Sequence, residues 1–326
     1  MSYLMLIAGF VVLAATGDFL VHGAVLLANR LGISPLIIGL TIVAFGTSAP
    51  ELVVSLQAAL TGSSSLAIGN VVGSNIANVL LVLGLPAIIR AATCSDKHME
   101  RNVAFMLGAS FLFAGLCWLG PLHFWHGALL FTLLLVFLLY SYSLAFGNGR
   151  NNVEFAEEAE ELIKESGEAS KSMPLTLLLI GIGIIGLPLG AKMTVDGASE
   201  IAATLGVSKA AIGLTAVALG TSLPELVTTI SCTLRGHGGM AFGNVLGSNM
   251  FNILAVMGVT AMVANVPVPD AVLHVDIWVM LGTALLVAPY ALNKLCMTRV
   301  HGVMFVLAYM AYIALVLAPQ FGHAGG

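Results

Sequence analysis

The chain has 326 residues, of which 59% are hydrophobic and only 9% are charged. Soluble globular proteins carry about 25% charged residues, so this composition excludes a soluble domain and predicts a polytopic protein whose main partner is the lipid bilayer. The net charge is −4 and there is no basic patch, which argues against a nucleic-acid partner.

The N-terminal stretch lacks a basic n-region and a cleavage signal, so we interpret it as a retained first membrane helix. Further apolar stretches long enough to cross a bilayer follow along the chain. We expect an all-α fold with ten membrane spans, at about 3–28, 34–60, 66–89, 103–120, 123–146, 174–203, 208–233, 240–265, 272–291 and 300–318.

The basic residues orient these spans. Ten of them fall in alternate connections or at the helix ends that face them, whereas the other connections carry only Lys209. The ten are Arg30, Arg90, Lys97, Arg101, Arg150, Lys164, Lys171, Arg235, Lys294 and Arg299. Because positive charge accumulates on the cytoplasmic side, we expect a multi-pass protein of the cell (inner) membrane with both termini extracytoplasmic and loop 148–173 cytoplasmic.

The loop at 148–173 is rich in glutamate, and we interpret it as a solvated acidic linker in preference to a calcium sensor. The four cysteines form no CxxC pair, so neither a disulfide framework nor a zinc site is expected. They are Cys94, Cys117, Cys232 and Cys296.

An internal repeat relates the two halves of the chain. Residues 31–84 align with 205–258 at a constant offset of 174, with 29 identities in 54 positions that include Gly, Ser, Asn, Pro and Glu. Five spans separate equivalent helices, and because five is odd the second copy is predicted to be inverted relative to the first. The predicted units are residues 1–147 with helices 1–5, and residues 174–326 with helices 6–10.

Each copy carries a proline and a glutamate inside an apolar span, Pro50–Glu51 and Pro224–Glu225. Proline has no backbone N–H and disfavours helical geometry at the preceding residue, so each helix should be interrupted near Gly-Thr-Ser. A charge at mid-bilayer costs at least about 2.5–3.5 kcal/mol. We therefore expect the two glutamates to meet near the midplane, where a cation compensates them.

Other polar residues match between the copies and complete a cage of oxygen atoms without imidazole or thiolate. They are Thr47, Ser48, Ser74, Asn78, Thr221, Ser222, Ser248 and Asn252. Hard cations prefer such ligands. The charge of the two carboxylates balances that of one Ca2+, and Na+ or H+ can neutralise it as well. An empty cage holds two uncompensated charges and should rarely change sides, so the pattern predicts obligatory exchange, with helices 1 and 6 sliding or rocking over the repeat core.

The motifs GTSAPE and GTSLPE, with GNVVGSNIANVL and GNVLGSNMFNIL, resemble the two α-repeats of the calcium/cation antiporter superfamily and are similar to those of prokaryotic sodium/calcium exchangers. The resemblance covers both repeats and the plan of ten spans. It implies Glu51 and Glu225 as central ligands, supported by the serines and asparagines above. It also implies backbone carbonyl ligands at Ala44, Thr47, Ala218 and Thr221. An Asp in place of Asn252 accompanies potassium dependence in related exchangers, so the Asn here argues against K+ co-transport.

The leading function is exchange of Ca2+ for Na+, and exchange of Ca2+ for H+ is a close alternative. A cation channel, an intramembrane hydrolase and a polar cluster that only joins helices are further alternatives, less favoured by paired Pro-Glu motifs. No P-loop is present, so we expect no ATP site, no cofactor and no enzyme activity, with an ion gradient supplying the energy. Asp18 with His22, and Lys192 with Asp196, are interpreted as locally neutralised pairs facing the helix bundle.

Overall fold

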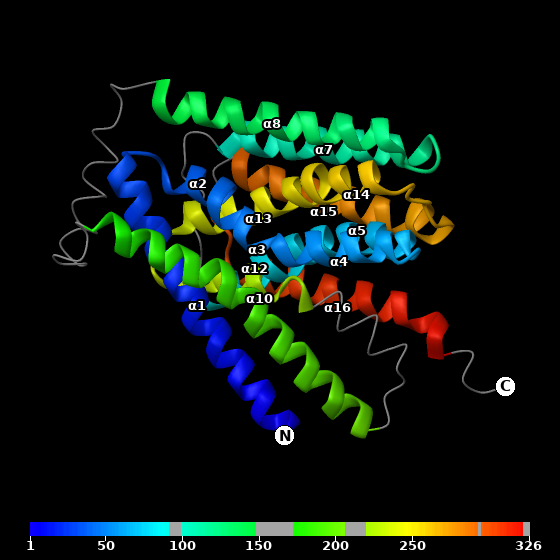
Figure 1. Cartoon of the computed structure of the whole chain (residues 1–326), viewed down its shortest axis with the longest axis horizontal. Coiled ribbons are helices and arrows are strands. Elements are labelled where there is room, and N and C mark those ends of the chain that lie inside the picture. Colours follow the sequence, from blue (N-terminus) through cyan, green and yellow to red (C-terminus); the bar gives the residue numbers. More distant parts are fainter. Residues whose placement is uncertain (91–98, 148–171, 206–219, 293–294, 322–326) are drawn as a thin grey trace.

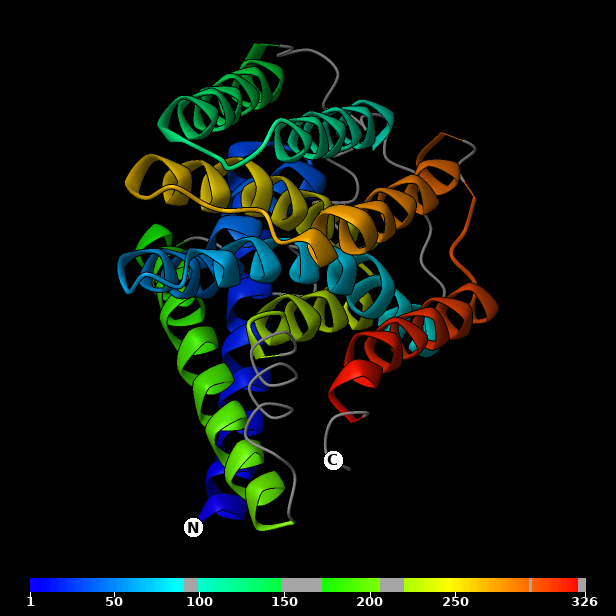
Figure 2. The same cartoon turned by 90° about the vertical axis from the view of Figure 1, so that its right-hand side faces the viewer.

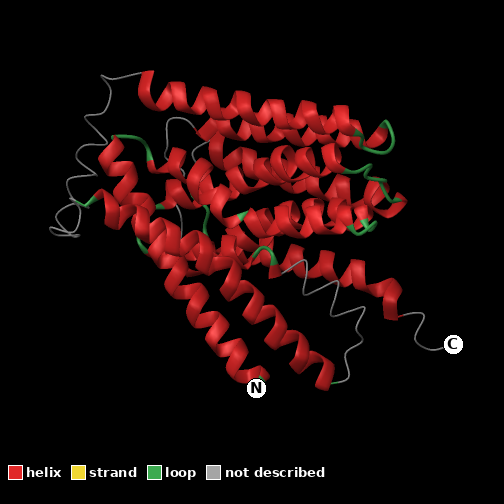
Figure 3. Cartoon of the chain, in the orientation of Figure 1, coloured by secondary structure: helices red, strands yellow, loops and turns green. Residues whose placement is uncertain are grey.

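The computed structural model describes residues 1–90, 99–147, 172–205, 220–292 and 295–321. Every regular element over these residues is a helix, and Figure 3 shows the helices joined by short loops. An isolated antiparallel bridge between Leu122 and Val266 joins two connecting loops. The predicted all-α class is confirmed.

In the first half, several spans are built from more than one helical piece, and η marks a π-helical turn. The elements are α1 (Ser2–Leu31), α2 (Pro35–Ile38), η1 (Gly39–Val43), α3 (Ala44–Thr47), α4 (Ala49–Leu60), α5 (Ser64–Ala77), η2 (Asn78–Leu83), α6 (Gly84–Ile89), α7 (Met99–Trp118) and α8 (Phe124–Gly147).

The second half repeats much of this order. Its elements are α10 (Met173–Thr204), α12 (Leu223–Leu234), α13 (Gly238–Phe251), η4 (Asn252–Met257), α14 (Gly258–Val263), η5 (Val272–Asp276), α15 (Ile277–Leu292) and α16 (Arg299–Phe321). The π-helical turns η2 and η4 begin at Asn78 and Asn252, which are equivalent positions of the repeat.

Eight helices in the described residues are long and apolar enough to cross a membrane. A ninth is added if the bent pair Pro35–Thr47 and Ala49–Leu60, which meet at 43°, counts as one broken span. The predicted span 208–233 lies partly outside the described residues, and its described part contains the shorter apolar helix α12.

Two long helices stand apart from the rest of the bundle. Figures 1 and 2 both show α1 and α10 side by side, projecting away from the other helices with the N-terminus at their far end. On the opposite side, α7 and α8 line the edge of the molecule. The repeat helices α4, α5, α12 and α13 lie between these two layers.

Glycines hold α1 and α10 in close contact. A Cβ atom at Gly183 would lie 2.5 Å from Leu20 Cβ, and one at Gly190 would lie 2.8 Å from the Leu13 backbone nitrogen. Gly186 faces the Thr16 side chain at even closer range. Because lipid removes most of the hydrophobic driving force between helices, such small residues allow the backbones to approach and gain van der Waals contact.

A second set of glycines joins the two repeat copies. A Cβ atom at Gly39 would lie 2.6 Å from the carbonyl oxygen of Met240, and one at Gly243 would lie 2.5 Å from that of Leu36. One at Gly247 would lie 2.6 Å from the carbonyl oxygen of Leu40. These contacts press α13 of the second copy against the broken helix of the first copy, so polar residues of both copies face each other in the interior.

Candidate cation site

Two helix starts define the centre of the molecule. Helix α4 begins at Ala49 after Ser48, and α12 begins at Leu223 after Ser222, with a proline in the first turn of each. The predicted interruption at Gly-Thr-Ser is therefore confirmed for the first copy, and the second copy shows a turn at Thr221 and Ser222.

Glu51 and Glu225 occupy the first turns of these two helices, and both are 0% exposed. The N-terminal turn of a helix carries a partial positive charge and unpaired N–H groups, which favour a carboxylate there. That stabilisation is well below the cost of burying two carboxylates, so these side chains need further compensation.

The two carboxylates lie together although they come from different copies. They are close enough for Glu225 to repel Glu51 electrostatically. The Ser48 hydroxyl of the first copy donates to Oε1 of Glu225 at 3.0 Å. Glu225 Oε2 and both carboxylate oxygens of Glu51 are buried without a hydrogen-bond partner. The two glutamates therefore lie together as expected, whereas their place at the membrane midplane stays a prediction.

Hydroxyl groups cross between the copies around this centre. The Thr47 hydroxyl lies 3.3 Å from Asn244 Oδ1 and 3.3 Å from the Ser248 hydroxyl. In the equivalent contact, the Thr221 hydroxyl lies 3.4 Å from Asn70 Oδ1 and 3.4 Å from the Ser74 hydroxyl.

Each of these contacts has its counterpart at the repeat offset. The predicted site residues Thr47 and Ser248 are thereby joined in one cluster, and Thr221 and Ser74 are joined in the equivalent cluster.

A group of buried amides continues from this network towards the π-helical turns. Asn252 Nδ2 donates to Asn75 Oδ1 at 3.3 Å, and Asn249 Nδ2 donates to the Asn75 carbonyl oxygen at 3.5 Å. Both amide atoms of Asn78 are buried without a hydrogen-bond partner. A π-helical turn breaks the regular bond pattern and is common at functional sites, and one begins at each of Asn78 and Asn252.

The remaining predicted positions differ from one another. The Ala44 carbonyl oxygen accepts from the Ser48 backbone N–H at 3.0 Å and lies 3.3 Å from the Thr47 hydroxyl, so it already has partners. The Ser222 hydroxyl is buried without a hydrogen-bond partner. Ala218 lies outside the described residues.

Sequence reasoning missed Asn70 and Asn244, which are buried beside the glutamates. Asn70 Nδ2 donates to the Glu51 carbonyl oxygen at 3.4 Å and to the Ser55 hydroxyl at 3.0 Å. Asn244 Nδ2 makes the equivalent bonds, to the Glu225 carbonyl oxygen at 3.4 Å and to Thr229 at 3.0 Å. The available signal was the Gly-Asn pair that matches in both copies.

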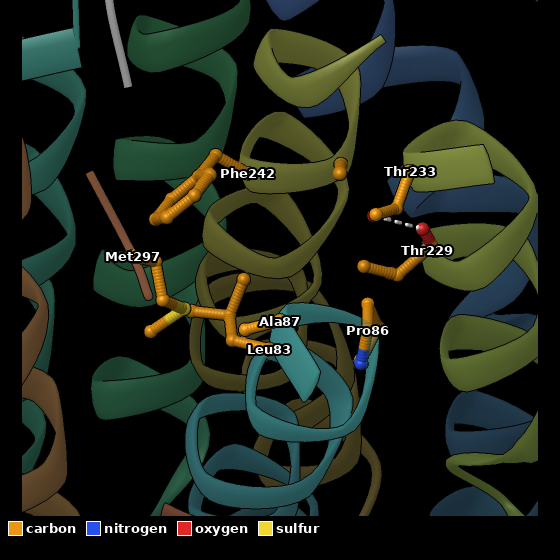
Figure 4. A pocket seen from close by; sticks show the side chains of 8 residues that line it. Leu83, Pro86, Ala87, Thr229, Thr233, Phe242 and Met297 are labelled. Carbon is orange, nitrogen blue, oxygen red and sulfur yellow. Dashed lines mark hydrogen bonds between the residues drawn. The ribbon is translucent and has the colours of Figure 1, made fainter. Parts of the chain in front are cut away.

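A small pocket adjoins this region (Figure 4). One wall carries Thr229 and Thr233, where the Thr233 hydroxyl donates to the Thr229 carbonyl oxygen at 2.8 Å. The remaining lining is apolar and includes Leu83, Phe242 and Met297. Such a lining does not supply the oxygen ligands that a hard cation requires.

The interpretation of the charged pairs on α1 and α10 is wrong. Asp18 binds Arg235, at the end of α12, through two hydrogen bonds of 2.7 Å each, so its main partner is not His22. Lys192 and Asp196 are exposed on α10, and the described residues form no ion pair between them. Position on a single helix did not reveal these long-range neighbours.

The described residues contain no group of three or more His, Cys, Asp or Glu side chains suited to a metal ion. The site is instead built from two carboxylates, hydroxyls and amides from both copies. That donor set is the one that hard cations prefer.

Comparison with known proteins agrees with this chemistry. The family model described as "Sodium/calcium exchanger protein" matches residues 1–143 and 175–318. The chain belongs to this family. It is therefore an integral membrane protein of a family of ion exchangers, and the resemblance noted in the sequence is confirmed.

Relatives of this exchanger-family protein match over most of its length. It is 36% identical to the inner membrane protein YrbG of Escherichia coli over 87% of this chain and 86% of the relative. It is 36% identical to the putative antiporter CaxA of Alkalimonas amylolytica over 95% of this chain and 96% of the relative. A solved structure of the sodium-calcium exchanger NCX_Mj, at 32% identity, covers 96% of this chain and 97% of its own, with a TM-score of 0.81.

Proposed function

We propose that the protein is a secondary active antiporter that exchanges Ca2+ for Na+ through a site between its two Gly-Thr-Ser-x-Pro-Glu segments. The observation that carries this proposal is the pair Glu51 and Glu225. Both are fully buried, they come from different copies, and they are close enough to repel each other. Two buried carboxylates need opposite charge, and one Ca2+ or two Na+ would supply it.

The proposed ligands are the carboxylates and the oxygen atoms gathered around them. They are Glu51, Glu225, Ser48, Ser222, Ser74, Ser248, Asn78, Asn252, Thr47 and Thr221, with the backbone carbonyl groups of Ala44, Thr47, Ala218 and Thr221. The family assignment and the printed name of the NCX_Mj structure, a sodium-calcium exchanger, support these ions as cargo. No cofactor is required, because the gradient of one ion drives the other.

The proposed architecture has ten spans arranged as two inverted units, residues 1–147 and 174–326, joined by a linker at 148–173. The constant offset of the repeat and the reciprocal hydrogen bonds across the centre support two equivalent units. Alternating access would then arise as α1 and α10 slide over the repeat core. Their glycine-lined contact and their separation from the other helices support a motion of these two helices together.

The distribution of basic residues supports an orientation with both termini extracytoplasmic and residues 148–173 cytoplasmic. The E. coli relative, named an inner membrane protein, supports a location in the cell membrane.

Exchange of Ca2+ for H+ is the second candidate, and the same pair of glutamates favours it. Two buried carboxylates can be neutralised by protons as well as by a metal ion. A site that releases Ca2+ when protonated would couple Ca2+ movement to a pH gradient.

Uptake of radioactive Ca2+ into proteoliposomes tests these proposals. An imposed outward Na+ gradient should drive uptake at constant pH if Na+ is the counter-ion. Uptake driven by a pH gradient without sodium would replace Na+ by H+. Uptake that needs no counter-ion, with single-channel currents in planar bilayers, would overturn exchange in favour of a channel.

A further inference from the structure

Two buried asparagines stand between the glutamates and the threonines of the opposite copy. Asn70 is 6% exposed and Asn244 is 0% exposed. Each is in the Gly-Asn pair of its own copy, at equivalent positions of the repeat. Neither was among the predicted ligands, so their contacts ask for an explanation.

The hydrogen bonds fix the orientation of both amides. The nitrogen of each amide donates to the carbonyl oxygen of the glutamate in its own copy, at 3.4 Å in both cases. A carbonyl oxygen can only accept, so the NH2 group must face it. Oδ1 of each asparagine therefore points to the other copy, where it meets the threonine hydroxyl, Thr221 for Asn70 and Thr47 for Asn244.

This orientation determines where the hydroxyl protons can go. An amide oxygen cannot donate, so in these contacts the threonine hydroxyl is the donor. Each threonine has a single proton, and once the asparagine accepts it only lone pairs remain on the hydroxyl oxygen. For Thr47, the competing acceptors are the Ala44 carbonyl oxygen and the Ser248 hydroxyl, each at 3.3 Å. Neither needs the threonine proton, because the Ala44 carbonyl oxygen also accepts from the Ser48 N–H and Ser248 can donate its own proton to Thr47.

The same hydroxyls face the carboxylates. Thr221 lies close to Glu51, and Thr47 lies close to Glu225. Neither threonine donates a hydrogen bond to its carboxylate here, because both oxygens of Glu51 and Oε2 of Glu225 are without a partner and Oε1 of Glu225 accepts from Ser48. A hydroxyl that directs its proton to a carboxylate cannot also offer that side to a metal ion. When a cation binds the carboxylate, the proton must turn away, and the amide oxygen is a fixed acceptor for it.

We propose that Asn70 and Asn244 are positioning residues that favour metal ions in the site by accepting the protons of Thr221 and Thr47, so that both threonine oxygens face the carboxylates as ligands. This inference rests on the proposed function. A proton on a carboxylate needs a single acceptor, whereas Ca2+ requires six to eight oxygen ligands. The asparagines therefore act on metal affinity through the threonines, without touching the ion themselves.

The experiment is a double-mutant cycle on Ca2+ affinity in proteoliposomes. Asn244→Leu and Thr47→Val should each raise the half-saturating Ca2+ concentration about tenfold, which is the effect expected from losing one hydrogen-bonded ligand. Because the asparagine acts through the threonine, the double variant should be no worse than the worse single variant. Thr47→Ser keeps the hydroxyl and should restore most of the Ca2+ affinity that Thr47→Val loses.

Matched measurements separate this role from a structural one. Ser110→Ala removes a buried hydroxyl whose only described bond is to the Met106 carbonyl oxygen, and it should leave the Ca2+ affinity unchanged. Thermal unfolding identifies variants that fail to fold, and in that case the comparison of Thr47→Val with Thr47→Ser carries the test with both asparagines intact.

Two results would overturn this inference and leave the proposed function standing. One is fully additive effects of Asn244→Leu and Thr47→Val. The other is an unchanged half-saturating Ca2+ concentration in folded variants of an active protein. A wild-type protein that neither binds nor exchanges Ca2+ would overturn the proposed function together with this inference.

Discussion

Replacing either glutamate of the central pair by glutamine should abolish Ca2+ uptake at ordinary concentrations. With both carboxylates present, a bound Ca2+ leaves the site neutral, whereas Glu51→Gln or Glu225→Gln leaves one uncompensated positive charge. A charge at the centre of a membrane costs at least about 2.5–3.5 kcal/mol. Since 1.4 kcal/mol is a factor of ten, the half-saturating Ca2+ concentration should rise roughly 100-fold in each variant.

The same substitutions should stabilise the ion-free protein. Glutamine removes one of two buried carboxylates that repel each other, so the midpoint of thermal unfolding without Ca2+ should rise while its increase on adding Ca2+ disappears. Asp276→Asn is the matched control, because this half-buried carboxylate accepts a bond of 3.0 Å from the Tyr312 hydroxyl that an amide oxygen can also accept. Wild-type uptake in either glutamine variant, or equal loss in the control, would refute the assignment of the site.

Three other predictions concern the surroundings of the site. Gly186→Ala should lower the unfolding temperature and slow exchange because its Cβ would strike α1, whereas Gly181→Ala, with open space around it, should do neither. Breaking the Asp18–Arg235 pair by Asp18→Asn should change the maximal exchange rate more than the Ca2+ affinity, and the charge swap Asp18→Arg with Arg235→Asp should restore the rate. Burial and the neighbouring Arg235 hold the pKa of His237 below its ordinary value of 6.5. The folded protein therefore binds fewer protons there than the unfolded chain, so as pH falls below about 6.5 the wild type should lose more thermal stability than His237→Gln.

The sequence predicted the interruption of the first repeat helix and the positions of both glutamates because local chemistry determines them. A proline within the span removes an N–H group wherever the chain folds, and the residue after it must then lie in the first turn of a new helix. The offset of 174 between the copies added the expectation that Glu51 and Glu225 meet.

Other features depend on contacts between distant segments and were not accessible in this way. The π-helical turns that begin at Asn78 and Asn252 contain no proline or glycine from which they could be predicted. The partner of Asp18 was assigned to its own helix by the spacing of four residues, whereas its true partner, Arg235, is 217 residues away in the chain. Spacing along one helix lists possible neighbours, and only packing between helices decides among them.

The two copies match in sequence at the helix breaks and in their threonine and asparagine contacts, but the contacts of their serines differ. Ser48 donates to Glu225, whereas the equivalent Ser222 hydroxyl and both oxygens of Glu51 are buried without a hydrogen-bond partner. The residue types at these positions are identical in both copies. The difference in hydrogen bonding therefore comes from the conformation of the two copies and from the helices packed around them, not from the identity of the serines and glutamates. Under the proposed mechanism, two inverted halves in unequal conformations describe one end state of the carrier, and exchanging those conformations describes the other. The serine that binds a carboxylate should then alternate between the copies as the site changes sides, so neither Ser48 nor Ser222 is dispensable over a complete cycle.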